Sequence, residues 1–172
     1  MSIKTNIYRI LSSTDPLTGV YNRAGLAQSI ETLFSSHESR EGVSLLIFDI
    51  DHFKTINDTR GHDVGDRVLK EFTELVTRSV RTGDSFGRWG GEEFVLLCVN
   101  TPREGVVILA EKIRNLVSEN LFNKNESPFN FTVSIGIACA KSGETFDALF
   151  KRADRQLYNS KTSGRNKVSI AD

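Results

Sequence analysis

The stretch "FGRWGGEEFVLL", from Phe86 to Leu97, places two glycines and two glutamates between two apolar runs. Apolar segments on both sides of Gly90 and Gly91 predict two strands, near 85–89 and 92–99, joined by a tight hairpin. By itself the pattern is equally typical of a charged edge facing solvent, because paired glutamates near a turn are common on surfaces. The rest of the sequence has to distinguish a surface turn from a site.

Composition limits the possible functions of the chain. Its 172 residues are enough for one well-packed domain, and 22 basic residues balance 22 acidic ones, which argues against a nucleic-acid binder. We find no apolar run of membrane-spanning length and no secretory signal. The two cysteines, Cys98 and Cys139, lie in apolar segments, so we expect reduced core residues and no cysteine-rich zinc site. The expected location is the cytoplasm, either as a free protein or as the cytoplasmic part of a larger, membrane-anchored one.

The first residues differ in pattern from the rest. Ile3, Ile7 and Ile10 form a narrow helical stripe, typical of the end of a coiled-coil stalk, and Pro16 and Gly19 then break it. We therefore divide the chain into a helical linker, 1–14, and one domain, 15–172.

Apolar periodicity predicts the elements of this domain. The continuous run 43–50 predicts a central strand buried on both faces, and strict alternation in 129–140 predicts a half-buried strand. A short strand is expected at 167–170, and a polar loop between 51 and 63. Helical stripes are predicted at Leu26, Ala27, Ile30, Leu33 and Phe34; at Val64, Val68, Phe72, Leu75 and Val76; at Val106, Leu109, Ile113 and Leu116; and at Phe146, Leu149, Phe150, Ala153 and Leu157.

The ends of two helices carry further signals. Thr101, Pro102 and Glu104 predict a capping box at the start of the third helix, and Gly164 ends the last one. The mixed order of strands and helices predicts an α+β fold, with one mainly antiparallel sheet flanked by helices.

Acidic residues mark the end of the predicted central strand. Asp49 and Asp51 project to one face if the strand continues that far, although two aspartates alone favour a strand end that reaches solvent. If the hairpin lies beside this strand, Glu92 and Glu93 join them in one cluster. Such a cluster suits Mg²⁺ or Mn²⁺ with substrate phosphates, as in two-metal nucleotidyl transfer.

Two polar stretches supply groups that a nucleotide needs. "HFKTINDTRGHDVGD" follows the aspartates, and "SKTSGRNK" lies near the end of the chain. His52 and His62 carry little weight as ligands, because surface histidines are usually solvated. The candidate groups are Asn57 and Asp66 for a base edge, the backbone amides of His52 and Phe53 for phosphates, and Lys161 and Arg165 for the charge of a triphosphate.

Four blocks together resemble the GGDEF-domain family, the diguanylate cyclases. The family's named motif stands here as "GGEEF", a frequent form of it. The blocks have the family's order and spacing, and they cover the chain from about Asp15 to its end. They are "DPLTGVYNR" (15–23), "FDIDHFKTINDTRGHDVGD" (48–66), "RWGGEEF" (88–94) and "ADRQLYNSKTSGRNKV" (153–168).

The resemblance implies a fold like the adenylyl cyclase and polymerase palm, and the condensation of two GTP into cyclic di-GMP with release of two pyrophosphates. Asp49, Glu92 and the carbonyl of Ile50 would bind two Mg²⁺ ions, for which Mn²⁺ can substitute. Glu92 would also assist deprotonation of the attacking 3′-hydroxyl, and Glu93 would only support the site. The nucleotide-binding residues would be His52, Phe53, Lys54, Asn57, Asp66, Gly90, Gly91, Lys161 and Arg165, with Lys54 near the chemistry, Asn57 and Asp66 selecting guanine, and the two glycines giving the triphosphate room.

The resemblance also implies partners and control. Because one domain would hold one GTP, catalysis would need an antiparallel homodimer, controlled by an upstream sensor domain that this sequence does not include. Arg81 and Asp84, in "RTGD", would form a product-inhibition site, for which a local ion pair in a turn is the alternative explanation. The third residue of that site falls at Lys112, which lacks the planar fork of arginine.

Other functions remain open from the sequence. The main alternative is a catalytically weak receptor for GTP or cyclic di-GMP. A second is another nucleotidyl cyclase or polymerase-like enzyme on a similar palm, from which Asn57 and Asp66 distinguish this chain because they suit guanine. A purely structural interaction domain fits the motifs least.

Overall fold

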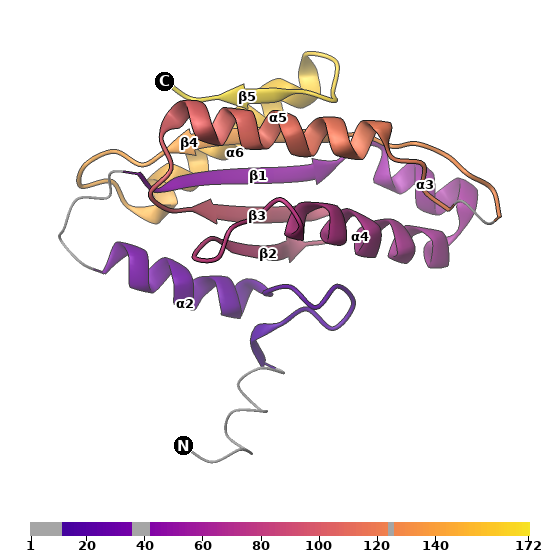
Figure 1. Ribbon diagram of the computed structural model, residues 1–172, viewed down its shortest axis with the longest axis horizontal. Coiled ribbons are helices and arrows are strands. Elements are labelled where there is room, and N and C mark those ends of the chain that lie inside the picture. Colours follow the sequence, from indigo (N-terminus) through magenta and orange to yellow (C-terminus); the bar gives the residue numbers. More distant parts are fainter. Residues whose placement is uncertain (1–11, 36–41, 124–125) are drawn as a thin grey trace.

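The computed structural model describes residues 12–35, 42–123 and 126–172 and contains one five-stranded sheet with helices on both faces. The helical stripe expected at Ile3–Ile10 lies outside these residues. The sheet order is β2-β3-β1-β4-β5 (Figure 1), so the predicted α+β class is confirmed. Within the described ranges, no helix combines the length and the apolar content needed to cross a bilayer.

The centre of the sheet is β1, Ser44–Ile50, all of whose residues are buried. It pairs antiparallel with β3 (Glu93–Cys98) on one side and with β4 (Val133–Cys139) on the other. The predicted central strand is therefore confirmed. The remaining strands are β2 (Ser85–Gly90), which forms the predicted hairpin with β3, and β5 (Val168–Ile170), which runs parallel to β4.

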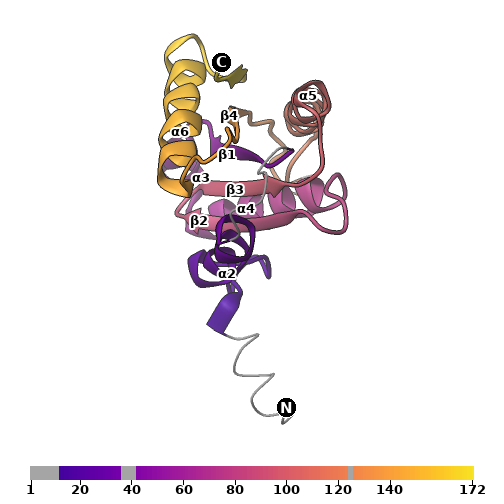
Figure 2. The same ribbon diagram turned by 90° about the vertical axis from the view of Figure 1, so that its left-hand side faces the viewer.

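Helices cover the two faces of the sheet in pairs. One face packs against α4 (His62–Thr77) and α5 (Arg103–Glu119), in a core that includes Phe48, Phe72 and Phe94. The other face packs against α2 (Arg23–Phe34) and α6 (Phe146–Thr162). Figure 2 shows α5 and α6 on opposite sides of the strands. All four helices correspond to predicted apolar stripes.

The prediction that the fourth strand is half-buried is wrong, because β4 is covered on both faces. Its large residues face α5, as the alternation predicted, whereas Ser134, Gly136 and Ala138 face the other way and are also buried. A Cβ at Gly136 would lie only 2.2 Å from the carbonyl oxygen of Ala153. The small residues of β4 therefore allow α6 to pack directly on the strand backbone.

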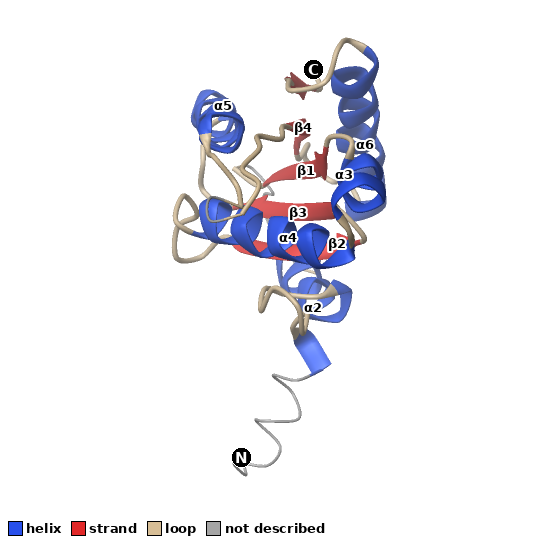
Figure 3. Cartoon of the chain, turned by 90° about the vertical axis from the view of Figure 1, so that its right-hand side faces the viewer, coloured by secondary structure: helices blue, strands red, loops and turns tan. Residues whose placement is uncertain are grey.

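The polar segment after β1 is not the loop that the sequence predicted. It contains a short helix, α3 (Phe53–Arg60), which lies at the same end of the molecule as the start of α4 (Figure 3). Only Ile56 of this helix is buried, so the segment has too few apolar residues for a helical period to be recognised. A left-handed residue, His52 at φ +55°, precedes the helix, and Gly61 at φ +88° ends it.

The start and the buried face of α5 also differ from the prediction. Thr101 does not cap the helix; its hydroxyl donates to the carbonyl of Val99 at 3.0 Å, and Pro102 stands at the N-cap. The residues facing the sheet are Val106, Ala110, Ile113 and Val117, while Leu116 is 37% exposed. The helix is rotated from the predicted orientation because the small Ala110, rather than Leu109, is fully buried against the core.

Candidate active site

The glycine hairpin lies beside the end of β1, as the sequence analysis required for a site. Asp49 is directly opposite Glu93 in the antiparallel register, and the amide of Ile50 donates to the carbonyl of Glu92 at 3.4 Å. Gly91 has φ +53°, a left-handed conformation that suits glycine at the turn. The two glutamates of the motif therefore follow the turn at the level of the aspartates.

A cavity of about 240 Å³ lies at this end of β1. Figure 1 shows β1 pointing toward α3 there. Four elements meet around the cavity: the end of β1, the first turn of α3, the hairpin, and the end of α6 with the loop after it. The lining residues are Asp49, Ile50, Asp51, His52, Phe53, Lys54, Thr55, Glu92, Lys161 and Arg165. The structure thus brings together eight of the predicted site residues, with Asp51 and Thr55 in addition.

Asp49 is the most perturbed acid of the cavity. Its side chain is 10% exposed, and Oδ2 lies 2.7 Å from Nζ of Lys161. Burial raises the pKa of Asp49 to about 6; Lys161 opposes the shift, and the nearby charges of Glu92 and Glu93 add to it. Burial also raises the pKa of Glu93, where Lys161 again opposes the shift while the charges of Asp154 and Glu92 add to it. An acid with a raised pKa in a cavity is typical of a functional site.

Asp51 has a different role from Asp49. Its carboxylate accepts hydrogen bonds from the hydroxyls of Thr132 (2.6 Å) and Ser134 (2.7 Å) and from the amide of Asn166 (3.0 Å). The prediction that both aspartates and both glutamates converge on one cluster is wrong. Across the described residues, no three His, Cys, Asp or Glu side chains are grouped closely enough to hold a metal ion. The reason is that β1 ends at Ile50, so that Asp51 faces the neighbouring strand.

The first turn of α3 presents backbone groups to the cavity. His52 is left-handed, and none of the described side chains caps the helix. The first amides of a helix have no partner within it and favour an anion. Phe53 and Lys54, both of which line the cavity, therefore lie where the sequence analysis expected phosphate contacts.

Two predicted groups, Asn57 and Asp66, do not line the cavity. Oδ1 of Asn57 would be 1.9 Å from a Cβ placed on Gly65, so the Asn57 side chain lies directly on the backbone of α4 next to Asp66. Gly65 therefore allows α3 and α4 to bring these two polar residues together. Both lie beyond the cavity, along the α3–α4 pair.

Gly90 and Gly91 line a separate hollow, with a volume of about 400 Å³, together with residues of the segment 15–24 and Arg88 and Trp89. Three residues that the sequence analysis did not assign hold this turn. Arg23 donates from Nε to the carbonyl of Trp89 at 2.6 Å and lies 4.6 Å from its ring, and Arg88 donates to the carbonyl of Gly91 at 2.8 Å. Asp15 forms an ion pair with Arg88 at 3.3 Å.

Asp15 is held by hydrogen bonds from Thr18 as well as by the ion pair with Arg88. Burial alone would raise the pKa, but hydrogen bonds from Thr18 and the charge of Arg88 outweigh it and lower the pKa of Asp15. The sequence signal was available, since Asp15 and Arg23 bound the block "DPLTGVYNR" and Arg88 precedes the glycines. No spacing rule predicted that these blocks meet.

The predicted inhibition residues lie at the opposite end of the hairpin strands. Oδ1 of Asp84 accepts from the amide of Val99 at 3.1 Å, whereas its buried Oδ2 has no hydrogen-bond donor among the described residues. Arg81 is exposed and donates to the hydroxyl of Thr101 at 3.4 Å; Lys112 is exposed on α5. Cys98, buried nearby, has a pKa raised by burial to about 12, and neither cysteine forms a disulfide.

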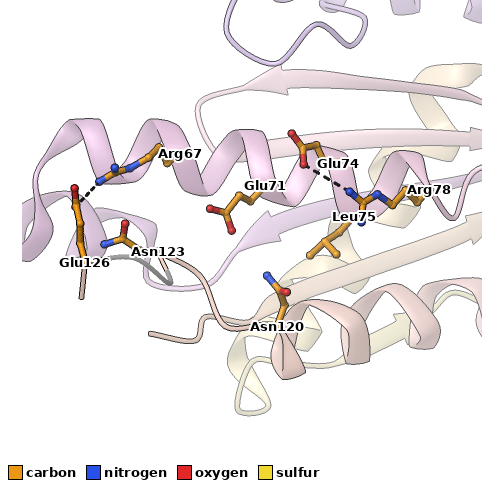
Figure 4. Close-up of a pocket in the computed structure, with 8 residues that line it drawn as sticks. All are labelled: Arg67, Glu71, Glu74, Leu75, Arg78, Asn120, Asn123 and Glu126. Atoms are coloured by element: carbon orange, nitrogen blue, oxygen red, sulfur yellow. Dashed lines mark hydrogen bonds and ion pairs between the residues drawn. The ribbon is translucent and has the colours of Figure 1, made fainter. Parts of the chain in front are cut away.

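A larger hollow of about 580 Å³ lies between α4 and the segment after α5 (Figure 4). It contains none of the predicted site residues. Two ion pairs lie at this hollow. Arg67 on α4 pairs with Glu126 at 3.1 Å, and Arg78 pairs with Glu74, one turn earlier at the end of α4, at 3.9 Å. Because its charged residues are largely paired with each other and exposed, we assign no function to this hollow.

Comparison with known proteins agrees with this geometry. The model of the family described as "Diguanylate cyclase, GGDEF domain" matches residues 12–167. This range includes every residue of the cavity and all four sequence blocks except Val168, the last residue of the fourth block.

The chain belongs to the GGDEF family.

Among its relatives, the response regulator PleD of Caulobacter vibrioides is 43% identical over 162 residues, which are 92% of this chain and 36% of PleD. The diguanylate cyclase DgcM of Escherichia coli is 43% identical over 158 residues, 91% of this chain and 38% of DgcM. This GGDEF chain thus spans little more than a third of the length of these relatives.

A solved structure has the same fold. The coiled coil and GGDEF domain of DgcB from Caulobacter crescentus, in complex with c-di-GMP, superimposes with a TM-score of 0.92 and 31% identity, covering 98% of this chain and 90% of that one. The fold predicted from the GGDEF resemblance is therefore confirmed.

Proposed function

We propose that this GGDEF chain is a diguanylate cyclase, which condenses two GTP into cyclic di-GMP. The observation that carries the proposal is the cavity at the end of β1, where two acids, Asp49 and Glu92, face three bases, Lys54, Lys161 and Arg165. Acids that bind a metal and bases that bind phosphates are the two sets of groups that nucleotidyl transfer needs. In each half-reaction, the 3′-oxygen of one GTP bonds to the α-phosphorus of the other, and the bond to the bridging oxygen breaks to release pyrophosphate.

The acids of the cavity fit a divalent cation that keeps several of its waters. Asp49, Glu92 and the carbonyl of Ile50 supply oxygen ligands only, which suits Mg²⁺ or Mn²⁺ bound jointly with substrate phosphates. Asp49 already binds one cation, the ammonium of Lys161. When bound, Mg²⁺ would neutralise phosphate charge and make the 3′-hydroxyl more acidic. Asp51 is not among the ligands we propose, because its oxygens already accept from Thr132, Ser134 and Asn166.

The basic groups fit the triphosphate. Lys161 and Arg165 approach the cavity from α6 and its following loop, and Lys54 approaches from α3. Together with the uncapped amides of α3 they would stabilise the charge that develops on the leaving pyrophosphate. The Gly90–Gly91 turn would leave the backbone open to the phosphates on its cavity side.

Guanine recognition is assigned to Asn57 and Asp66. An amide oxygen and amide NH₂ from Asn57 and a carboxylate from Asp66 offer acceptors to the N1 and N2 hydrogens of guanine and a donor to its O6. Adenine has no donor at the first two positions, so these groups would discriminate against ATP. The Asn57 side chain lies against Gly65, the residue before Asp66, which supports a joint role.

Each chain would bind one of the two GTP molecules that the reaction needs. A cavity of about 240 Å³ is small even for one nucleotide, since ligand sites commonly reach about 300–1,000 Å³. The attacking hydroxyl would therefore come from a GTP bound to a second copy, in an antiparallel homodimer. An upstream sensor domain would control how the two copies meet.

Product inhibition is assigned to Arg81, Asp84 and Lys112. The side chains of Arg81 and Lys112 are exposed, and Asp84 follows Arg81 by three residues. A guanine base or a phosphate of the product offers the acceptors that the Arg81 guanidinium prefers. Because Lys112 contributes charge without a planar fork, inhibition should be weaker than with arginine at this position.

The test is to incubate the protein with GTP and Mg²⁺ and to separate the nucleotides by chromatography. We expect cyclic di-GMP from the unchanged chain, none from Asp49→Asn or Glu92→Gln, and unchanged yield from Glu104→Gln, an exposed acid on α5. ATP should compete poorly. A chain that binds GTP or cyclic di-GMP but forms no product would be a receptor, and the cyclase proposal would be rejected.

A further inference from the structure

The loop between α6 and β5 has an unusual backbone conformation beside the cavity. Arg165 has φ +61° and Asn166 has φ +45°, so that two successive residues other than glycine are left-handed. Side chains disfavour this region, asparagine less than most. A turn of this kind persists only where its surroundings hold it.

Two distant elements hold Asn166 at two different atoms. Its backbone amide donates to Oδ2 of Asp51 at 3.0 Å, directly after β1. Its side-chain Oδ1 accepts from Nη1 of Arg114 on α5 at 2.8 Å. Both the backbone and the side chain of Asn166 are therefore held in place.

Both anchors are themselves rigidly placed. Asp51 is 4% exposed, and its carboxylate also accepts from the hydroxyls of Thr132 and Ser134 on the β4 side. The Arg114 side chain is 19% exposed and donates from Nε to Glu111 at 2.8 Å. A buried carboxylate with several donors and an arginine with a second partner have little freedom to move.

The neighbouring Arg165 is the residue that this arrangement directs. Its amide donates to the carbonyl of Ser160 at 3.0 Å, which fixes the chain on the other side of it. Its side chain is exposed and lines the cavity with Asp49 and Lys161. The backbone of Arg165 is therefore held from both directions, and only the side chain remains free to meet a ligand.

We propose that Asn166, held by Asp51 and Arg114, is a positioning residue that directs Arg165 at the terminal phosphates of the substrate. This proposal deepens the function proposed above and rests on it. It also gives Asp51 a role, as an anchor of the phosphate-binding loop. Positioning of a charged donor lowers the cost of forming its phosphate contact, because less motion has to be frozen when the ligand binds.

The test compares binding of GTP and GMP, in Mg²⁺, by titration calorimetry. Asn166→Ala removes the side-chain contact and disfavours the left-handed turn, so we expect about tenfold weaker GTP binding, the effect of one impaired charged hydrogen bond. GMP has no terminal phosphates, and its affinity should change less than about twofold. The matched control is Asn159→Ala, which removes an exposed asparagine in the last turn of α6, shortly before the loop that contains Asn166. It should change neither the GTP affinity nor the GMP affinity.

A double-mutant cycle with Arg165→Ala then separates positioning from a direct contact. In that background Asn166→Ala should have little further effect on GTP binding, because it acts through Arg165. Full additivity would overturn the proposal, and so would equal losses for GTP and GMP. If Asn166→Ala does not fold, Arg114→Met tests the same contact from α5, with the same expected selectivity for GTP.

Failure of the two proposals can be told apart because binding is measured without turnover. An unchanged chain that binds GTP while Asn166→Ala and Arg114→Met bind it equally well would reject only the positioning role. An unchanged chain that binds no GTP at all would reject the proposed function, and the positioning role with it.

Discussion

The carboxylate of Asp49 is buried, and burial disfavours its charged form. Burial raises its pKa to about 6, compared with about 3.9 in an unfolded chain. The folded chain thus holds the proton more tightly than the unfolded one, so ionisation of Asp49 destabilises the fold. This cost is absent below about pH 4, develops as the pH rises, and is complete above about pH 6.

Replacement of Asp49 by Asn should therefore stabilise the protein at pH 8 while it abolishes activity. A shift of about two pKa units, which already includes the opposing effect of Lys161, corresponds to at most about 3 kcal/mol, and the buried amide of Asn must still be hydrogen-bonded, so we expect about 1–2 kcal/mol. Urea unfolding at pH 8 and pH 4 measures it, and the difference should nearly vanish at pH 4. Asp58→Asn, an exposed acid on α3, is the control. A less stable Asp49→Asn at pH 8 would contradict the assigned cost.

The proposed inhibition site leads to a second prediction at this scale. Arg81→Ala removes an exposed guanidinium from that site and should raise the cyclic di-GMP concentration needed for half-inhibition by about tenfold or more, as one charged hydrogen bond would. Initial turnover should stay intact, because Arg81 lies at the far end of β2 from the cavity. Inhibition curves with added cyclic di-GMP check this, and Lys112→Arg should shift them in the opposite direction. Unchanged product affinity in Arg81→Ala would refute the assignment.

Individual residues were predictable from the sequence where the motif fixed their type. Asp49, Glu92, Lys161 and Arg165 were assigned in advance, and the structure brings them to one cavity. The residue pattern alone did not distinguish Asp51 from Asp49, although the resemblance implied only Asp49 as a metal ligand. The hydrogen-bond partners of Asp51 lie far along the chain, so no local pattern predicts them. Spacing of two residues along a strand predicts a shared face only while the strand continues.

At the scale of elements, the contact of α6 with β4 determines where Lys161 lies. Gly136→Ala would place a Cβ 2.2 Å from the carbonyl oxygen of Ala153, and backbone atoms cannot move aside as a side chain can. We expect a loss of about 3 kcal/mol or more in unfolding free energy, at the upper end for overpacking. GTP affinity should fall as well, because displacement of α6 moves Lys161.

A matched glycine provides the control for that variant. Gly105, inside α5, would place its new Cβ 3.2 Å from a methyl group of Thr101, a tight contact with a side chain, which opposes a gain of about 1 kcal/mol in helix propensity, so we expect Gly105→Ala to change the unfolding free energy by less than about 1 kcal/mol in either direction. Thermal and urea unfolding of both variants distinguish a specific contact from a general intolerance of glycine replacement. Equal stability of Gly136→Ala and the unchanged chain would show that α6 does not depend on this close approach.

Elements with strong apolar periodicity were predicted well, and weakly apolar ones were not. The stripes of α4 and α6 and the apolar run of β1 have enough buried residues to reveal their period. α3 buries only Ile56 and is fixed by packing on α4, so its sequence resembles a loop. Both faces of β4 are buried because α6 packs on Gly136. This is a tertiary contact, which the alternation of apolar residues along one strand cannot predict.

At the scale of the whole molecule, the proposed active site and the proposed inhibition site lie at opposite ends of the strands of the sheet. The cavity lies where β1 ends, and Arg81 and Asp84 of the proposed inhibition site lie just before β2 begins. The GGDEF resemblance predicted this fold, and the family match and the solved structure confirm it. In the proposed dimer mechanism each copy supplies one cavity at the end of β1, so association of two copies is expected to limit turnover.

Turnover should therefore depend on protein concentration in a characteristic way. If the active species is a homodimer, the rate at saturating GTP should rise with about the square of the chain concentration when monomers dominate, and in proportion to it once dimers do. Chromatographic assays over a wide dilution series measure this rate, and sedimentation velocity gives the dimer fraction at the same concentrations. GTP binding per chain should not follow the same curve, because each cavity lies within one copy. A rate strictly proportional to concentration throughout, in a range where sedimentation finds only monomers, would show that one chain completes the reaction alone and would refute the dimer mechanism.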